Sequence, residues 1–275
     1  MRRVMYVLLA LVFAPSAFAD DLSWLTGPQA SNVPVVNGWA GVYIGGQVGY
    51  SNAGGDFSKT TKDPIAFALR NTTLEEQVMP SNWQVLGQAN HSAAGFGGFV
   101  GYNTQFERLM LGVEANYDQA NLSLIAPNSP ISRRVTAGGI PYDVTVTGSG
   151  SVSDLNFGTL RARGGWALGN FLPYAFAGVA VGHANVNIVG TTFGVQNPPL
   201  GCPPGTNPPC VPFSFTGTAG KNGEWLLGFA VGGGLDVALT HNVFLRAEYE
   251  FVQFAPVANL VVSVNTVRGG LGVKF

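Results

Sequence analysis

Hydrophobic and polar residues alternate with a period of two in eight segments of the chain. The clearest segment is Trp225 to Leu239, where large apolar residues alternate with small or polar ones. This pattern predicts β-strands that have an apolar environment on one face and a polar environment on the other. The predicted strands are Trp39–Tyr50, Ala94–Asn103, Leu109–Asp118, Leu155–Trp166, Leu172–Ile188, Trp225–Leu239, Val243–Phe251 and a last strand that ends at Phe275.

Two of these segments do not follow the pattern cleanly. The strand that ends at Trp166 begins with Leu155 and Phe157, whose positions contradict the alternation further along. A β-bulge or an error in the assumed register explains this break. Both faces of the segment Leu172–Ile188 are partly apolar, so its inward and outward positions stay open.

The connections between predicted strands alternate between short and long. Short turns fall at residues 105–108, 167–171 and 240–242, and long connections at 51–93, 119–154 and 189–224, with a shorter one at 252–257. An even number of strands with alternating loop lengths is typical of an up-and-down transmembrane barrel. In such barrels the short turns are periplasmic and the long loops extracellular.

The C-terminal strand has one apolar face, which ends in an aromatic residue. Val267, Leu271, Val273 and Phe275 lie on this face, and cationic residues or glycines lie on the other. A chain end is usually polar and frayed in a soluble protein. Phe275 instead indicates a strand that ends at a membrane interface.

The N-terminus carries the pattern of a secretory signal. Arg2 and Arg3 precede an apolar stretch, and Ala17 to Ala19 form a small-x-small site, so we expect cleavage between Ala19 and Asp20. The alternative, an uncleaved membrane anchor, needs a longer apolar run. The predicted organisation is a signal peptide at residues 1–19, a flexible periplasmic segment at 20–38 and a barrel at 39–275.

Composition supports a membrane protein that crosses with strands. Charged residues make up 11% of the chain, below the usual quarter, and the mean hydropathy is +0.22. After the signal, no apolar run approaches the ~20 residues of a spanning helix. A closed barrel is the other structure that pairs every backbone group within lipid. The predicted fold is therefore all-β: an eight-stranded antiparallel up-and-down transmembrane β-barrel with short periplasmic turns and long extracellular loops.

Several charged residues are predicted to point into the barrel. An eight-stranded barrel has room only for its own side chains, so inward charges must pair or contact water. They would form either a gateable, conducting lumen or a salt-bridged plug. The predicted lumen network contains Glu114, Arg161, Arg163, Asp236, Arg246, Glu248, Glu250 and Arg268, and Lys274 is expected to face the same lumen.

Cys202 and Cys210 are the only cysteines. In an exported protein they predict a disulfide that closes a short loop, stabilising the fold by roughly 2.5 kcal/mol in the chain-entropy model. A metal site is the alternative, but no histidine or acidic residue lies near the pair. We therefore predict no metal and no cofactor.

Other function classes receive little support. Removing Arg2 and Arg3 from the 14 basic residues leaves 12 against 15 acidic ones, a net charge of −3, which argues against nucleic acid as a partner. The three histidines, His91, His183 and His241, form no recurring catalytic spacing with serine and an acid, so we do not expect an enzyme.

Four stretches carry a resemblance to a known family. They are Trp39–Gly46, Gly98–Asn103, Leu160–Gly165 and Thr266–Arg268 together with the ending Lys274–Phe275. They resemble the small outer-membrane immunogenic, or porin-like, β-barrel proteins of Gram-negative bacteria, which are relatives of the OmpA transmembrane domain. The resemblance implies that Phe275 is part of the signal read by the barrel-assembly machinery. It also implies haem binding at the surface as an option. The sequence singles out no haem ligand; His91 is exposed enough, but we expect it to be an ordinary solvated loop residue.

The expected partners are outer-membrane lipid, the barrel-assembly machinery and a surface ligand of the long loops; the oligomeric state stays open. The expected function is a structural, surface-exposed role in the outer membrane with at most minor porin-like diffusion. The alternative is a surface binding or uptake protein that uses its long loops for haem or a host ligand. A soluble lipocalin-type barrel would need its apolar faces pointing inward, which the charges opposite them contradict.

Overall fold

The computed structural model describes residues 38–197, 210–220 and 222–275, which belong to one compact unit. Eight antiparallel strands close into a barrel, and β10 pairs with β1 from Tyr43 opposite Lys274 to Asp56 opposite Val261. This confirms the predicted fold class. The barrel strands are β1 (Gly41–Asp56), β2 (Gln88–Phe106), β3 (Leu109–Ile125), β5 (Ile140–Trp166), β6 (Phe171–Gln196), β8 (Glu224–Ala238), β9 (Val243–Phe254) and β10 (Val261–Lys274).

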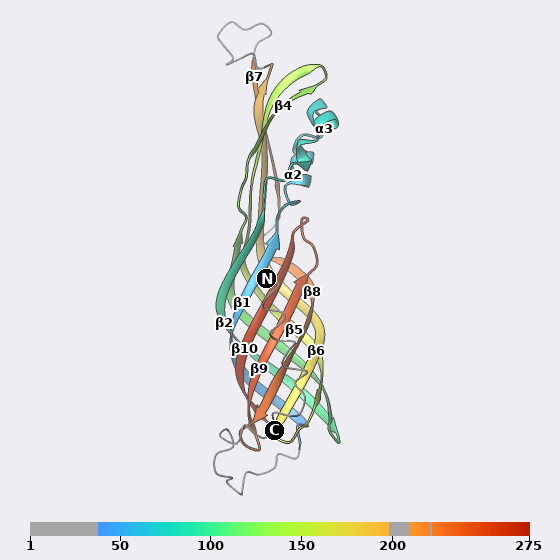
Figure 1. Ribbon diagram of the computed structural model, residues 1–275, viewed down its shortest axis with the longest axis vertical. Coiled ribbons are helices and arrows are strands. Elements are labelled where there is room, and N and C mark those ends of the chain that lie inside the picture. Colours follow the sequence, from blue (N-terminus) through green and yellow to red (C-terminus); the bar gives the residue numbers. More distant parts are fainter. Residues whose placement is uncertain (1–37, 198–209, 221) are drawn as a thin grey trace, which may run out of the picture. The chain divides into compact units, whose positions relative to one another are not determined.

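Two of the barrel strands continue far beyond the barrel (Figure 1). β5 has 27 residues and β6 has 26. A strand of 27 residues is about 90 Å long, whereas about 10 residues cross the apolar band of an outer membrane. Beyond the barrel, β4 (Ile131–Ala137) pairs with β5, and β7 (Val211–Ala219) pairs with β6. We call this four-stranded sheet, β4-β5-β6-β7, the extension sheet.

The extension sheet corrects the prediction that residues 119–154 and 189–224 are long loops between strands. Much of both segments is strand, including residues 140–154, 189–196 and all of β7. The short turns are confirmed, because residues 107–108, 167–170 and 239–242 join consecutive barrel strands.

The connection between β1 and β2 contains α2 (Lys62–Ala68), α3 (Thr73–Val78) and a 3₁₀ turn, η2 (Pro80–Asn82). Thr72 caps α3, because its side chain accepts a hydrogen bond from the backbone N–H of Glu75 at 3.2 Å. α2 packs against β7 so closely that a Cβ atom at Gly217 would lie 2.0 Å from the carbonyl oxygen of Pro64. Glycine at this position therefore permits the contact. Among the described residues, no helix is long and apolar enough to span a membrane.

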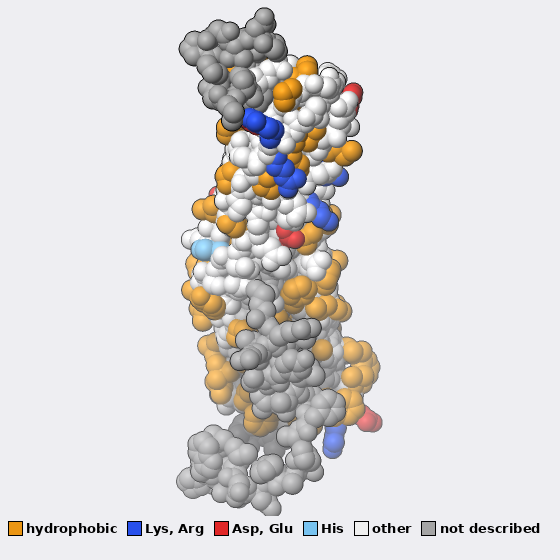
Figure 2. Space-filling model, turned by 45° about the horizontal axis from the view of Figure 1, so that its top comes forward, with side chains coloured by type: hydrophobic (Ala, Val, Ile, Leu, Met, Phe, Trp, Pro, Cys, Tyr) orange, Lys and Arg blue, Asp and Glu red, His pale blue; other side chains and the backbone are white. Residues whose placement is uncertain are grey.

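The polarity of the inner and outer faces of the barrel strands reverses along the strands. On the barrel, large apolar side chains such as Val48, Leu227 and Leu271 point outward. Figure 2 shows hydrophobic side chains gathered on the barrel surface that faces the viewer. Further along the same strands, the outward positions carry uncharged polar residues such as Asn52 and Asn265, and the interior becomes an apolar core. The exchange matches a surface that passes from lipid into water.

The break in the pattern at Leu155 and Phe157 reflects a change in the barrel interior, because both residues share the inward phase of Arg161 but lie in the apolar core. A β-bulge lies just before them. The register of β5 against β6 shifts between Ser153 and Asn156, and Asp154 has a φ of 57°. Beyond the bulge, Leu155 and Phe157 both point inward and are 1% exposed. The structure also decides which face of β6 points inward, a question that the sequence left undecided. In its barrel part, Tyr174 and the other even-numbered residues point inward.

Candidate functional site

The structure places all eight predicted lumen charges inside the barrel, each at most 3% exposed. They come from β3, β5, β8, β9 and β10, which bring together residues up to 132 positions apart in sequence. Asp118 of β3 joins them at one end, with 12% of its side chain exposed. We call these nine residues the lumen cluster.

Arg161 lies at the centre of the lumen cluster. Its guanidinium donates hydrogen bonds to Glu114, to Glu248 at 2.9 Å and to Glu250 at 3.2 Å. Arg268 donates to the same two glutamates of β9, at 2.8 Å and 2.7 Å, and to Asp118. Two arginines from different strands therefore hold both β9 carboxylates.

Arg163 and Arg246 form the second half of the lumen cluster. Both donate to Glu114, at 3.0 Å and 2.8 Å, and both contact Asp236, at 2.7 Å and 2.8 Å. Tyr43 donates its hydroxyl proton to Glu114 at 2.7 Å. Glu114 thus accepts hydrogen bonds from three guanidinium groups and one phenol, so its carboxylate is well satisfied.

Aromatic rings cover the guanidinium planes on the periplasmic side. Arg161 lies 4.0 Å from the ring centre of Phe176, Arg246 lies 4.0 Å from that of Phe99, and Arg163 lies 3.9 Å from that of Tyr174. Stacked cations of this kind gain about 0.5–2 kcal/mol each. The arginines are therefore held both at their edges, by carboxylates, and on their faces.

The lumen cluster is close to electrically neutral. Its four guanidinium groups face four carboxylates whose side chains are at most 2% exposed, and the fifth, Asp118, reaches solvent. Burying charges costs several kcal/mol per ion, so such a cluster adds little net stability. Removing one partner, however, leaves a buried charge unpaired and costs about 3–5 kcal/mol.

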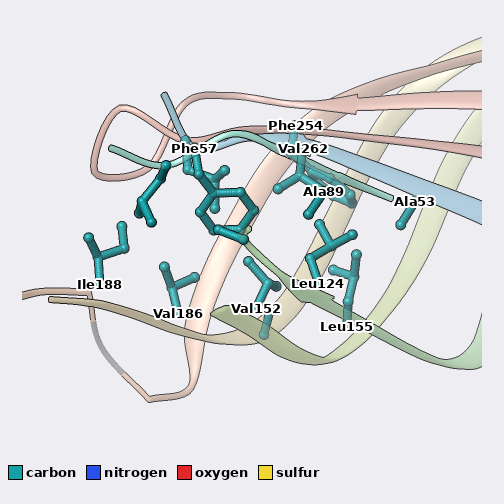
Figure 3. Close-up of a cluster of buried hydrophobic side chains, with 14 of the residues drawn as sticks. Ala53, Phe57, Ala89, Leu124, Val152, Leu155, Val186, Ile188, Phe254 and Val262 are labelled. Atoms are coloured by element: carbon teal, nitrogen blue, oxygen red, sulfur yellow. The ribbon is translucent and has the colours of Figure 1, made fainter. Parts of the chain in front are cut away.

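Apolar layers close the barrel interior on both sides of the lumen cluster. On the periplasmic side, Trp39 is 3% exposed, donates its indole N–H to the Gly169 carbonyl at 3.3 Å, and packs edge-on against Phe244 at 6.2 Å. On the other side, Phe57, Phe254 and many aliphatic residues form a buried apolar core (Figure 3). Apolar side chains therefore lie on both sides of the lumen cluster in the described part of the chain.

Some interior residues were not part of the predicted network. Tyr174 donates to Glu248 at 2.6 Å, and Gln47 donates to Asp118 at 2.7 Å and to Asn116 at 2.8 Å. Gln47, Asn116 and Asp118 lie on the faces predicted to point inward, so alternation alone could have found them. Tyr174 could not be found this way, because the orientation of its strand was open.

Two further residues singled out in the sequence, Lys274 and Phe275, lie outside the lumen cluster. Lys274 does not join the lumen cluster; its ammonium group donates to the Gly38 carbonyl at the periplasmic end. Phe275 is 75% exposed, and its backbone N–H donates to the Val42 carbonyl at 2.9 Å. Its role in assembly stays a prediction.

Other predictions fall on residues outside the described ranges. The signal-cleavage site at Ala19 and Asp20 is one of them. The pairing of Cys202 with Cys210 is another, because Cys202 lies outside the described residues.

The histidines are separate from one another. The imidazole of His91 accepts a hydrogen bond from the Ser123 N–H at 3.4 Å, and His183 packs edge-on against Trp225 at 5.3 Å. Within the described part of the chain, no group of three or more His, Cys, Asp or Glu residues is arranged to hold a metal ion.

Solved outer-membrane barrels resemble this structure in fold only. Neisserial surface protein A is 15% identical and covers 86% of this chain and 98% of its own, with a TM-score of 0.38. Ail, the attachment invasion locus protein of Yersinia pestis, is 12% identical and covers 86% of this chain and 100% of its own, with a TM-score of 0.30.

Sequence comparisons identify the family. The 25 kDa outer-membrane immunogenic protein of Brucella ovis is 24% identical over 267 residues, which cover 96% of this chain and 93% of the relative. The Brucella canis protein of the same description is 24% identical over 278 residues, with the same coverage. Residues 6–275 match the outer membrane protein beta-barrel domain. The chain therefore belongs to this family of outer-membrane β-barrels, and its location is the outer membrane.

Proposed function

We propose that this protein is a closed outer-membrane anchor that presents a rigid β-structure at the cell surface and passes little or no solute. The observation that carries the proposal is the position of Arg161, which bridges carboxylates from β3 and β9 across the lumen. Its side chain is fully buried, so it occupies the space that a pore would need.

A pathway through the barrel would require several favourable contacts to break together. Arg161 would have to leave three carboxylates, and a charge that stays buried without a partner costs about 3–5 kcal/mol. The aromatic layer around Trp39 and the core around Phe57 would also have to separate. The combined cost makes spontaneous opening rare on the timescale of solute diffusion.

Electrical recording in a planar lipid bilayer tests the proposal. We expect purified full-length protein to produce no reproducible conductance steps, while an open porin added to the same bilayer produces them. Steps of constant size that appear with the wild-type protein and scale with its amount would refute the closed barrel. The variant Arg161→Ser tests whether the lumen cluster is the barrier to ions. If it is, conductance steps should appear with this variant and not with the wild-type protein. Heat-modifiable gel mobility checks that the variant is folded.

A second candidate function is binding of a surface ligand, such as haem or a host molecule. It is favoured by the exposed aromatic Phe67 on α2, which is 66% exposed and has the Arg70 guanidinium stacked over it at 4.0 Å. Residues on an ordered scaffold are suited to binding. A haem titration followed at the Soret band tests one ligand: a shift that disappears in His91→Ala would support haem binding, and an unchanged band would remove it.

A further inference from the structure

The lipid-facing surface carries an apolar depression across β1, β10, β9 and β8. Its floor consists of the outward-facing Gly46, Gly269 and Ala247, and larger side chains such as Leu245 and Leu271 rise around it. Its volume is about 650 Å³, and it is open to the surroundings along the barrel surface. The strand register places the floor residues on two neighbouring rows, because Gly46 lies opposite Leu271 and Gly269 lies opposite Ala247.

A second depression of about 520 Å³ adjoins the first. It is lined by Val48, Ala94 and Phe96, and Val48 also forms part of the wall of the first depression. The second depression leads toward the extracellular side, since Ser92 is the next outward-facing residue of β2 beyond Ala94. Together the two depressions form a strip that runs across β8, β9, β10, β1 and β2, because Leu235, Ala247, Gly269, Val48 and Phe96 follow one another in the strand register.

A group of hydrogen-bonded polar residues lies beyond this strip, toward the extracellular side. Asn52 pairs with Ser92 on one side and with Asn265 on the other in the strand register. The Asn52 amide donates to the Ser92 hydroxyl at 2.7 Å, and the Tyr249 hydroxyl donates to the Asn265 carbonyl oxygen at 2.7 Å. We call these four residues the polar row; it lies about 13 Å along the strand from Val48.

The polar row contains amides and hydroxyls and no charged side chain. Such groups donate to and accept from uncharged hydroxyl and amide groups. A phosphate, in contrast, is usually held by arginine or lysine. The chemistry of the row therefore matches a neutral, hydroxyl-bearing head group.

We propose that the two depressions and the polar row together bind one outer-leaflet lipid, with an acyl chain in the depressions and a neutral sugar-type head group on the row. The occupant follows from continuity with the membrane interface, because the depressions lie on the apolar surface that faces hydrocarbon. The site is independent of whether the lumen conducts.

Glycine substitutions offer a direct way to fill the depression. A Cβ atom at Gly46 would have one neighbour, a carbonyl oxygen at 4.0 Å, and a Cβ atom at Gly269 would have its nearest neighbour at 3.8 Å. Both positions therefore accept a side chain without moving the backbone. Gly164 of β5 gives a matched control, because it also faces lipid with its nearest neighbour at 3.7 Å, but lies on the other side of the barrel.

The experiment uses native mass spectrometry of the full-length protein in detergent with two synthetic lipids that have identical palmitoyl chains. One carries a glucosyl head and the other a phosphatidylglycerol head. We expect wild-type protein and Gly164→Leu to retain one glucosyl lipid, with at least a tenfold preference over phosphatidylglycerol. The double variant Gly46→Leu/Gly269→Leu should lose at least nine tenths of both bound lipids.

The head-group contribution is tested separately. Asn52→Val/Asn265→Val should retain the chain but lose the tenfold preference between the two heads. Heat-modifiable gel mobility checks that each variant is folded, and Gly269→Val alone replaces the double leucine variant if that variant does not fold.

Four results would overturn the proposal. One is equal lipid retention in wild-type and depression-filled protein, and another is no retained lipid in the wild type. The third is a cross-linked dimer that disappears when the depressions are filled, because a second copy of the chain would then be the occupant. A wild-type preference for phosphatidylglycerol would refute the neutral head group.

Discussion

Replacing Arg161 with methionine should destabilise the folded barrel by about 3–5 kcal/mol, because it removes one partner from a buried ion-pair cluster. The loss is not shared equally among its partners. Glu114 keeps Arg163, Arg246 and the Tyr43 hydroxyl. Glu250 keeps only Arg268, so most of the penalty should fall on this carboxylate.

A second substitution tests where the penalty arises. In Arg161→Met/Glu250→Gln, the carboxylate that keeps the fewest partners loses its charge together with the arginine. The double variant should recover more than half of the stability lost in the single variant, which a double-mutant cycle measures as a coupling energy. Methionine preserves much of the volume of the arginine stem, so a packing defect contributes little.

The assay is a urea titration of the protein in lipid–detergent micelles, followed by heat-modifiable gel mobility. The matched control is Arg134→Met, which removes an ion pair with Asp143 whose side chains are 55% and 48% exposed. An exposed pair of this kind should change the stability by about 0–1 kcal/mol. The reasoning would be refuted if Arg161→Met cost no more than the control, or if the double variant were less stable than the single one.

Three further predictions concern other parts of the chain. Gly217→Val should detach α2, because its side chain would overlap the Pro64 carbonyl; limited proteolysis should then cut the helix while the barrel stays heat-modifiable, and an uncut helix would contradict the close contact. Trp39→Ala should lower the stability by about 3–5 kcal/mol through the cavity that it leaves at the periplasmic end, measured by the same urea titration; a loss under ~1 kcal/mol would show that this end is not packed. In a cysteine-free background, Asn265→Cys should react with a membrane-impermeant maleimide on whole cells, whereas Val267→Cys should not. Equal labelling of the two variants would show that the edge of the apolar band does not lie between these residues.

The positions of the interior charges could be predicted because lipid and lumen impose opposite chemistry on neighbouring residues. In β3, outward Val113 and inward Glu114 differ so strongly that period-2 alternation assigns both faces. The same contrast explains why the strand number and the short turns were predictable.

The extension sheet could not be recognised in the same way. Beyond the membrane, outward positions such as Thr145 and Thr191 are polar, inward positions such as Val144 are apolar, and the bulge at Asp154 reverses the expected phase. Glycines and prolines in these segments also resemble loop composition. The sequence pattern of these segments therefore indicated loops, although pairing with neighbouring strands makes them part of a β-sheet.

The sequence by itself determined that strands alternate between lipid and lumen, and it identified the eight charges that point inward. The tertiary structure alone decided which of them pair. Arg161 and Glu248 are 87 residues apart and meet because closure brings β5 and β9 to facing walls of one narrow barrel. A linear pattern encodes the environment of each residue, whereas the partner of a charge depends on strand order, register and tilt, which are properties of the closed barrel.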